Sequence, residues 1–347
     1  MTASGMTPAS DLDQPVLDHL DLLTDDRGLF EHARYEVPRR EHGYCVDDAA
    51  RGLVVMCHEP EPGPTARRLA RCYLAFVLDA LDATGSCHNR MAVDGQWRDE
   101  AAVGDWWGRA LWGLGVAATS APTPGMRARA LGGFRIAAQR RSPYLRSMAF
   151  AALGAAEVLR KRPDEIAARG LLTDMLAVVA GAGDGSPRWP WPEERLSYAN
   201  ASIAEALIVA GAALPDGPAL SRGLSLLEFL LHIQTRDGHL SVIPVGGRGR
   251  DDVGPGYDQQ PIEVSALADA CGSAFRITRQ SSWLAGVDLA WDWFGGDNDS
   301  VTPMFDPGTG GGYDGLERHG RNLNQGAEST LAMLATAQQA RQISDPE

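Results

Sequence analysis

The chain has 347 residues, of which 44% are hydrophobic and 22% are charged. This balance supports a sizeable buried core and excludes disordered and fibrous proteins. The formal net charge of −13 argues against a nucleic-acid partner, because binding to phosphates needs a basic face.

Further classes are excluded by motifs that the sequence lacks. No run approaches the ~18 uninterrupted apolar residues of a membrane helix, and the first residues resemble no signal peptide. We therefore expect a soluble, cytoplasmic protein that does not engage a membrane. Lys161 is the single lysine, which leaves little for Schiff-base or P-loop chemistry. The five cysteines form no CxxC pair, so we expect no disulfide framework, no metal and no cofactor.

Hydrophobic periodicity and helix start signals predict about twelve helices. In chain order they cover residues 14–24, 44–58, 64–83, 104–119, 124–140, 143–160, 164–182, 199–214, 217–234, 260–277, 280–294 and 325–341. The odd members of this series are amphipathic, with stripes such as Leu69, Tyr73 and Phe76. The even members are apolar on most faces and need cover on two sides. Six one-sided helices around six two-sided helices predict an all-α fold, the (α/α)6 toroid.

We expect a single domain over residues 14–341, between flexible ends of residues 1–13 and 342–347. The connections that lead into the even helices are long. They cover residues 25–43, 84–103, 183–198, 235–259 and 295–324. Long loops in a compact domain are usually functional, so one rim of the ring is expected to carry the site.

Polar residues concentrate where the even helices begin, as in GYCVDDAARGL (43–53) and DEAAVGDWWGRALW (99–112). A charge on a helix covered from two sides is expensive unless it is paired or faces a wet cavity, and the centre of a toroid is such a cavity. The candidates for substrate binding are Tyr44, Asp47, Arg51, Arg109, Trp189, Trp191, Glu194, Asn200, Asp258, Gln259, Gln260, Asp314, Asn324, Gln325 and Glu328.

Structural explanations compete with this interpretation. Asp47 with Arg51 and Asp105 with Arg109 are i,i+4 pairs, each worth about 0.2–0.5 kcal/mol if exposed. Asn200 also fits a helix N-cap. A functional site is favoured because five of the six inner helices begin with acids or amides.

Acids, amides and arginines beside indoles suit the recognition of a saccharide. Trp189 and Trp191 lie in a proline-stiffened loop and are predicted to stack on sugar rings. Two carboxyl groups that flank a glycosidic bond provide an acid and a base or nucleophile. We predict Glu263 as the general acid, because burial in a first helical turn raises a carboxyl pKa. Asp48 and Asp105 are the candidates for the base or nucleophile, with Asp258 behind them.

A family resemblance accompanies these motifs. GYCVDDAARGL, WPWPEERLSYANASIAEAL, YDQQPIEVSALADA and GGGYDGLERHGRNLNQGAESTLAML resemble the six-hairpin glycosidase-like superfamily, over Tyr35 to Ala340. More narrowly, the chain is similar to a bacterial family found beside or fused to sugar-nucleotide glycosyltransferases. The resemblance implies a toroid, a saccharide substrate and a glycosyltransferase encoded nearby as partner, but no catalytic assignment. The sequence departs from the family pattern at Ala49, where an Asn is expected, and at Ala199, where an Asp is expected.

Two alternatives to glycosidic cleavage stay open. A sugar isomerase or epimerase on the same fold would move protons with histidines, for which the loops offer candidates. These histidines are His32, His42, His88, His239 and His319. A non-catalytic saccharide-binding domain that assists a glycosyltransferase is the other alternative.

Overall fold

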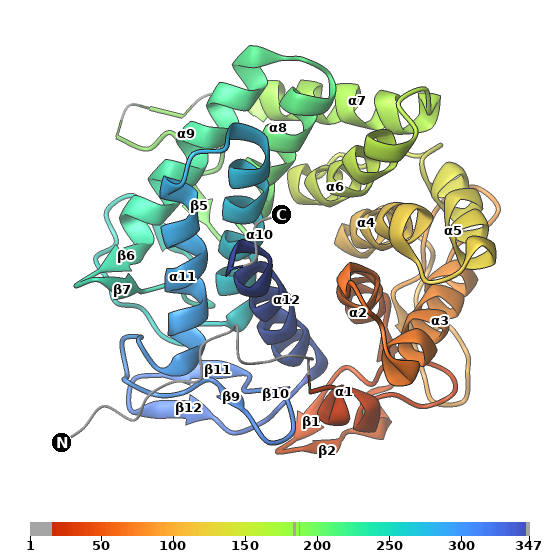
Figure 1. Ribbon diagram of the computed structural model, residues 1–347, viewed down its shortest axis with the longest axis horizontal. Helices are drawn as coiled ribbons and strands as arrows, with labels where there is room; N and C mark the ends of the chain where they lie inside the picture. Colours follow the sequence, from red (N-terminus) through yellow and green to blue (C-terminus); the bar gives the residue numbers. More distant parts are fainter. Residues whose placement is uncertain (1–15, 183–184, 187, 345–347) are drawn as a thin grey trace.

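The computed structural model describes residues 16–182, 185–186 and 188–344, and these residues contain twelve α-helices. Six form the inner wall of a ring (Figure 1): α2 (Val46–His58), α4 (Asp105–Ser120), α6 (Leu145–Lys161), α8 (Ala201–Ala213), α10 (Pro261–Thr278) and α12 (Ala327–Ser344). Six lie outside: α1 (Asp18–Leu22), α3 (Pro64–Asp79), α5 (Pro124–Ala137), α7 (Ile166–Ala182), α9 (Gly217–Gln234) and α11 (Ser282–Gly295). None of the described helices has both the length and the apolar composition of a membrane span.

The inner wall is closed. Each inner helix packs against the next one along the chain, and α12 returns to pack against α2. The outer helices α3, α5, α7, α9 and α11 each pack on inner neighbours. The all-α (α/α)6 toroid predicted from the two kinds of helix is therefore confirmed, including the alternation of inner and outer members.

Short strands fasten the long connections that lead to the inner helices. They form six two-stranded antiparallel sheets among the described residues. The pairs are β1 (Ala33–Arg34) with β2 (Val37–Pro38), β3 (Tyr44–Cys45) with β4 (Arg90–Met91), β5 (Arg195–Leu196) with β8 (Arg248–Gly249), β6 (Thr235–Arg236) with β7 (His239–Leu240), β9 (Phe305–Asp306) with β10 (Gly311–Gly312), and β11 (Gly315–Glu317) with β12 (Gly320–Asn322). The rim that these loops form is thus built from hydrogen-bonded pairs.

Helix starts follow the local signals in the sequence. Proline stands in the first turn of α3, α5, α9 and α10, where its missing N–H would have no intrahelical partner. Thr123 and Asp216 cap α5 and α9 by accepting backbone N–H bonds through their side chains.

The first and last helices differ from their predicted bounds. The predicted helix over 14–24 is reduced to the five residues of α1. Thr24 donates its hydroxyl to the carbonyl of Leu20 and bridges to Leu29, so the chain turns back before another helical turn forms. At the other end, α12 continues to Ser344, into the segment expected to be flexible. The predicted flexible residues 1–13 lie outside the described residues.

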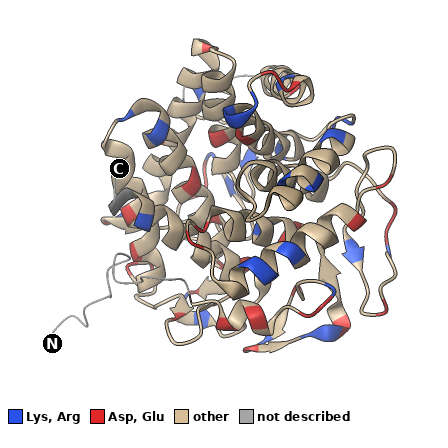
Figure 2. Cartoon of the chain, turned by 45° about the vertical axis from the view of Figure 1, so that its right-hand side comes forward, with Lys and Arg blue, Asp and Glu red and all other residues tan. Residues whose placement is uncertain are grey.

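Charges of both signs alternate over the ring. In the view of Figure 2, Lys and Arg residues are interspersed with Asp and Glu along the helices.

Helices α4 and α6 approach each other through glycines. A Cβ atom on Gly154 would lie 2.1 Å from the carbonyl oxygen of Leu111, and one on Gly115 would lie 2.2 Å from that of Gly154. The inner wall is therefore too tight at this contact for any side chain.

We expect Gly154→Ala to lower the free energy of unfolding by about 1–3 kcal/mol, because the methyl group forces two backbones apart. The matched control is Gly132→Ala in α5, where a Cβ meets no atom within 4 Å. This change is expected to stabilise the protein by about 0.5–1 kcal/mol through helix propensity. Urea denaturation measures both; equal effects would contradict the tight contact.

Candidate functional site

A cavity of about 450 Å³ opens at the mouth of the ring, where the inner helices begin. We call it the acidic pocket, because it is lined by six carboxyl side chains and only two guanidinium groups. Its lining residues are Glu31, His32, Cys45, Asp47, Asp48, Arg51, Arg90, Tyr198, Asp258, Gln260, Asp314, Asn322, Gly326, Glu328 and Ser329.

Seven of the residues predicted from sequence line this pocket. They are Asp47, Asp48, Arg51, Asp258, Gln260, Asp314 and Glu328. They come from the first turns of α2 and α12, from the residue that caps α10, and from two of the long loops. The ring closure brings these ends together, which explains why residues almost 300 positions apart share one cavity.

Arg51 joins α2 to α12 on the floor of the acidic pocket. Its guanidinium lies 2.6 Å from an Asp48 carboxylate oxygen and 2.7 Å from one of Glu328. Asp48 is buried, with 3% of its surface exposed. Burial raises the pKa of Asp48 to about 7, and the charge of Arg51 opposes this rise. A carboxyl group with that pKa can donate a proton at neutral pH.

Arg109 pairs with the neighbouring inner helix α2 rather than along its own helix. Its Nε atom lies 3.1 Å from Asp47 Oδ1, and its guanidinium stands 3.9 Å from the centre of the Phe150 ring. The i,i+4 pairs considered from sequence are replaced by this inter-helix pair, because Asp105 turns to other partners.

Asp258 is the carboxyl group of the acidic pocket with the fewest commitments. One of its oxygens, Oδ1, is buried and has no hydrogen-bond partner. Burial raises the pKa of Asp258, with a further contribution from the charges of Glu317 and Asp314. Asp314 is held differently, since its Oδ1 accepts the Gly326 N–H at 2.7 Å. Burial raises the pKa of Asp314 as well.

A histidine pair stands at the edge of the acidic pocket. The Nδ1 atoms of His32 and His42 are 3.0 Å apart, a distance at which one ring donates to the other. Burial and the neighbouring His42 lower the pKa of His32, which favours its neutral form. Nearby, Arg90 forms an ion pair with Glu31.

One group of possible metal ligands occurs among the described residues. Ligand atoms of Glu31, Cys45 and Asp48 lie within 4.8 Å of one another. The Cys45 thiol, however, donates to the side chain of Asn89, and burial raises its pKa well above the usual range. A metal needs the thiolate, so this arrangement is a poor metal site.

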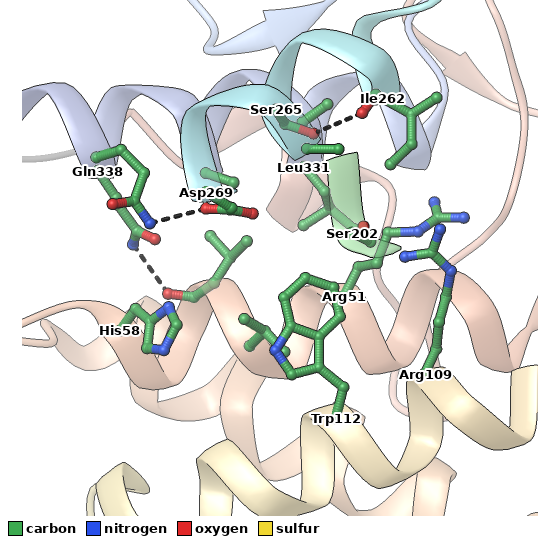
Figure 3. A pocket seen from close by; sticks show the side chains of 16 residues that line it. Arg51, His58, Arg109, Trp112, Ser202, Ile262, Ser265, Asp269, Leu331 and Gln338 are labelled. Atoms are coloured by element: carbon green, nitrogen blue, oxygen red, sulfur yellow. Dashed lines mark hydrogen bonds between the residues drawn. The ribbon is translucent and has the colours of Figure 1, made fainter. Parts of the chain in front are cut away.

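A second, narrower cavity of about 30 Å³ continues along the axis of the ring (Figure 3). The guanidinium groups of Arg51 and Arg109 lie side by side at one end of it, and His58 lies at the other. Burial lowers the pKa of His58 to about 4. Arg109 Nη2 is buried with no hydrogen-bond partner. The polar mouth thus passes into a mostly apolar interior with polar ends.

Two buried acids, Glu205 and Asp269, interact beside the narrower cavity, which Asp269 lines. Glu205 accepts a hydrogen bond from Ser273 at 2.7 Å, and Asp269 accepts one from Gln339 at 2.8 Å. Burial raises the pKa of both carboxyl groups, and their mutual repulsion adds to the rise for Glu205. Arg276 links the partners of the two acids, because it donates hydrogen bonds to both Ser273 and Gln339.

These raised pKa values predict that the protein becomes less stable as the pH rises. An acid whose pKa is raised on folding stabilises the fold below its unfolded pKa, and the stabilisation is lost as the pH rises through the folded value. We expect the free energy of unfolding to fall between about pH 5 and 9. Glu205→Gln should flatten this fall, whereas Glu61→Gln, at an exposed site, should leave it unchanged. Chemical denaturation across this pH range tests both, and an unaltered slope in Glu205→Gln would refute the assignment.

The predicted general acid, Glu263, lies behind the acidic pocket and is not among its lining residues. Its carboxylate accepts the backbone N–H of Ala199 and, at 2.9 Å, the side-chain amide of Asn200. Burial raises the pKa of Glu263 to about 7, but both oxygens are occupied by N–H donors. Glu263 therefore fastens the start of α10 to the start of α8.

Asp105 and Asn200 belong to the same supporting network. Asp105 accepts the hydroxyls of Ser147, at 2.5 Å, and of Tyr198, which itself lines the acidic pocket. Asn200 is fully buried and accepts from Arg146 at 3.2 Å. These side chains position the loop that carries Tyr198 and do not face the pocket.

The two predicted stacking residues are buried instead. Trp189 and Trp191 have 6% and 1% of their surfaces exposed. Trp189 packs edge-on against Phe229 of α9, and its indole N–H donates to the carbonyl of Glu193. Both rings are core residues, because the loop folds inward onto α9. Glu194 is exposed. The side chain of Glu193 accepts hydrogen bonds from the two Nη atoms of Arg146.

The remaining sequence candidates support the rim without lining the acidic pocket. Tyr44 is buried and donates its hydroxyl to Asp25 at 2.7 Å. Gln259 is fully buried, and its amide donates to Asp299 at 2.6 Å. Gln325 is buried; its backbone carbonyl pairs with His19 Nε2, whereas its side-chain Oε1 has no hydrogen-bond partner. Asn324 accepts the N–H of Tyr35 through its side-chain oxygen. The side chains of Tyr44, Gln259 and Asn324 thus satisfy other groups of the loops.

Comparisons with known proteins address the fold. No family model matches the chain, and no curated protein matches it in sequence. Solved structures do match over nearly their whole length. A sugar epimerase from a ruminal bacterium superposes with a TM-score of 0.71 at 13% identity, covering 95% of this chain and 97% of that one. The chain has the fold of an (α/α)6 toroid.

Two further toroids give the same result. Cellobiose 2-epimerase from Spirochaeta thermophila has a TM-score of 0.70 at 14% identity, with 97% and 96% of the chains covered. A GH76 α-mannanase from Bacteroides thetaiotaomicron has a TM-score of 0.66 at 11% identity, with 95% and 94% covered. At these identities the likeness establishes a common architecture.

Sequence reasoning missed several residues that line the acidic pocket of this toroid. Glu31 and Arg90 come from loops recognised as functional, but neither stands near a helix start. Tyr198 was overlooked beside the more conspicuous indoles. Cys45 is buried and also borders the cavity.

Proposed function

We propose that the protein is a carbohydrate-active enzyme that cleaves a glycosidic bond in the acidic pocket. The observation that carries the proposal is the pairing of two unlike carboxyl groups in one cavity. Asp48 has a pKa raised to about 7, whereas Asp258 has an oxygen without a partner. A protonated and an uncommitted carboxyl group are what glycoside cleavage needs.

Asp48 is the proposed general acid, which protonates the oxygen of the leaving sugar. After the proton has been transferred, the guanidinium of Arg51 stabilises the Asp48 carboxylate that forms. Asp258 is the proposed base or nucleophile, since neither a guanidinium nor an N–H donor occupies its Oδ1. These assignments replace the sequence-based choice of Glu263, which we propose as a positioning residue.

The charge of the acidic pocket supports a neutral saccharide as substrate. Six carboxyl groups face two guanidinium groups, and both guanidinium groups are paired with carboxylates. An anionic sugar would meet repulsion there, whereas neutral hydroxyl groups can bind carboxylates and amides. The neighbouring toroids that act on mannan and cellobiose are consistent with a neutral saccharide.

His32 favours a second candidate, sugar epimerisation or isomerisation. It is the histidine among the described residues that line the acidic pocket, and its lowered pKa keeps it neutral and able to accept a proton from carbon. Two of the structurally similar toroids are sugar epimerases by their names. A non-catalytic saccharide-binding domain, or an associated glycosyltransferase, remains a prediction from sequence alone.

A panel of neutral mono- and oligosaccharides, incubated with the protein in D₂O and followed by NMR, tests these functions. We expect new reducing ends without deuterium at carbon, with or without added phosphate. Deuterium incorporated at a carbon next to the carbonyl would favour the epimerase. Thermal stabilisation by a saccharide without any product would favour the binding domain.

A further inference from the structure

A second recess lies beside the acidic pocket, between two hairpins of the rim. It has a volume of about 940 Å³ and is bounded by the β1–β2 hairpin on one side and by the β12 end with residues 323–324 on the other. We call it the rim groove. Figure 1 shows β1–β2 and β11–β12 at the same side of the ring. Asn322 lines both the rim groove and the acidic pocket, so the two cavities adjoin at this residue.

The rim groove differs from the acidic pocket in chemistry. It exposes large apolar side chains, with Tyr35 at 52%, Val37 at 60% and Leu323 at 51% of their surfaces. Its charged residues are Arg34, Arg39, Arg321, Glu41 and Glu317, so basic and acidic groups are nearly balanced. The carboxylate excess therefore ends where the groove begins.

Tyr35 is held in place by its backbone. Its N–H donates to Asn324 Oδ1 at 3.0 Å, and its carbonyl accepts the N–H of Gln325 at 2.9 Å. These bonds support a left-handed conformation with φ of 53°, which a non-glycine residue adopts at a cost. Because the backbone is already fixed, binding through this ring does not have to order the loop. The Asn324 side chain thus serves this ring rather than the acidic pocket.

We propose that the rim groove binds the second sugar of an oligosaccharide whose terminal sugar occupies the acidic pocket. This inference rests on the proposed function and specifies its substrate as longer than one sugar. The Tyr35 ring offers a face for the apolar side of a sugar ring, and the amide of Asn322 can bind its hydroxyl groups. Because the two cavities adjoin at Asn322, a disaccharide that occupies both would have its glycosidic bond beside the acidic pocket.

Binding measured against chain length tests the proposal. The probes are glucose and mannose and their β-1,4-linked oligomers of two to five units, titrated by calorimetry into Asp258→Asn, which should not cleave them, and into the same protein with Tyr35→Ala added. Asp258→Asn should gain affinity from one unit to two, and the added Tyr35→Ala should lose about 3- to 10-fold for the oligomers while keeping its affinity for the monosaccharide. Tyr35→Phe should retain the gain, because it keeps the ring.

Two controls make the result decisive. Tyr144→Ala removes another exposed tyrosine, 63% accessible, which lines neither cavity, and it should leave all affinities unchanged. Leu323→Ala should weaken the oligomers in the same direction as Tyr35→Ala. The proposal for the rim groove fails if a second sugar unit adds no affinity, or if Tyr35→Ala weakens all lengths equally. The proposed function is unaffected by either result. Absence of both binding and turnover for every saccharide overturns the proposed function and the groove with it.

Discussion

Asp48→Asn is expected to reduce turnover of the saccharide substrate by about 10²- to 10⁴-fold, the usual contribution of a general acid. The amide keeps the volume of the side chain and can still accept from Arg51, so the fold should persist. In the wild type, activity should fall as the pH rises above about 7, because Asp48 then loses its proton. Initial rates over a pH series measure both effects.

Substrates with good leaving groups separate Asp48 from Asp258. An aryl glycoside whose phenol leaves without protonation needs no general acid, so Asp48→Asn should recover much of its rate on it. Asp258→Asn should stay inactive, because the base or nucleophile is needed whatever the leaving group. Glu194→Gln, at an exposed site away from the acidic pocket, is the control and should retain full activity. If Asp48→Asn and Asp258→Asn both keep wild-type activity, the assignment fails.

Arg109→Met is expected to lower the free energy of unfolding by about 1–3 kcal/mol, because it removes the partner of the Asp47 carboxylate, whose side chain is 22% exposed in the acidic pocket. Arg109 has 1% of its surface exposed, and its Nε atom binds Asp47. Methionine fills part of the space against Phe150 but leaves Asp47 without its partner. Urea denaturation measures the loss.

A double variant and an exposed pair serve as controls for Arg109. Asp47→Asn combined with Arg109→Met should recover part of the loss, since no uncompensated charge remains. Arg98→Met breaks an ion pair with Asp94 in which both side chains are more than half exposed. That change should cost no more than about 1 kcal/mol. If Arg109→Met lowered the free energy of unfolding by less than about 1 kcal/mol, the pair of Arg109 and Asp47 would contribute little to stability.

The agreement between sequence and structure is closest for the helices. Their periodic apolar faces are local properties, so the bounds of α2, α9 and α10 follow from neighbouring residues, with first-turn prolines at the starts of α9 and α10. The distinction between one-sided and two-sided helices also predicts which of them form the inner wall. Because the starts of the inner helices meet at one rim of the ring, the sequence also predicted that their acids lie near the mouth.

The direction of each polar side chain could not be predicted in this way. Asp48 and Glu263 both occupy first turns of inner helices, yet Asp48 lines the acidic pocket and Glu263 is tied to Ala199 and Asn200. The composition around Trp189 and Trp191 suited stacking on a sugar, but both indoles are buried, that of Trp189 against Phe229 of α9. Composition does not report which way a loop folds.

The sequence by itself determined the class of fold, the order of its helices and the end of the ring at which charge gathers, because periodicity and helix starts act over a few residues. Only the tertiary structure decided which carboxyl groups face one cavity, since Asp48, Asp258 and Glu328 meet through closure of the ring. It also decided that Tyr35 and Asn322 extend that cavity, because two hairpins from opposite ends of the chain lie beside each other there. Contacts between residues so far apart depend on packing, which no local pattern encodes.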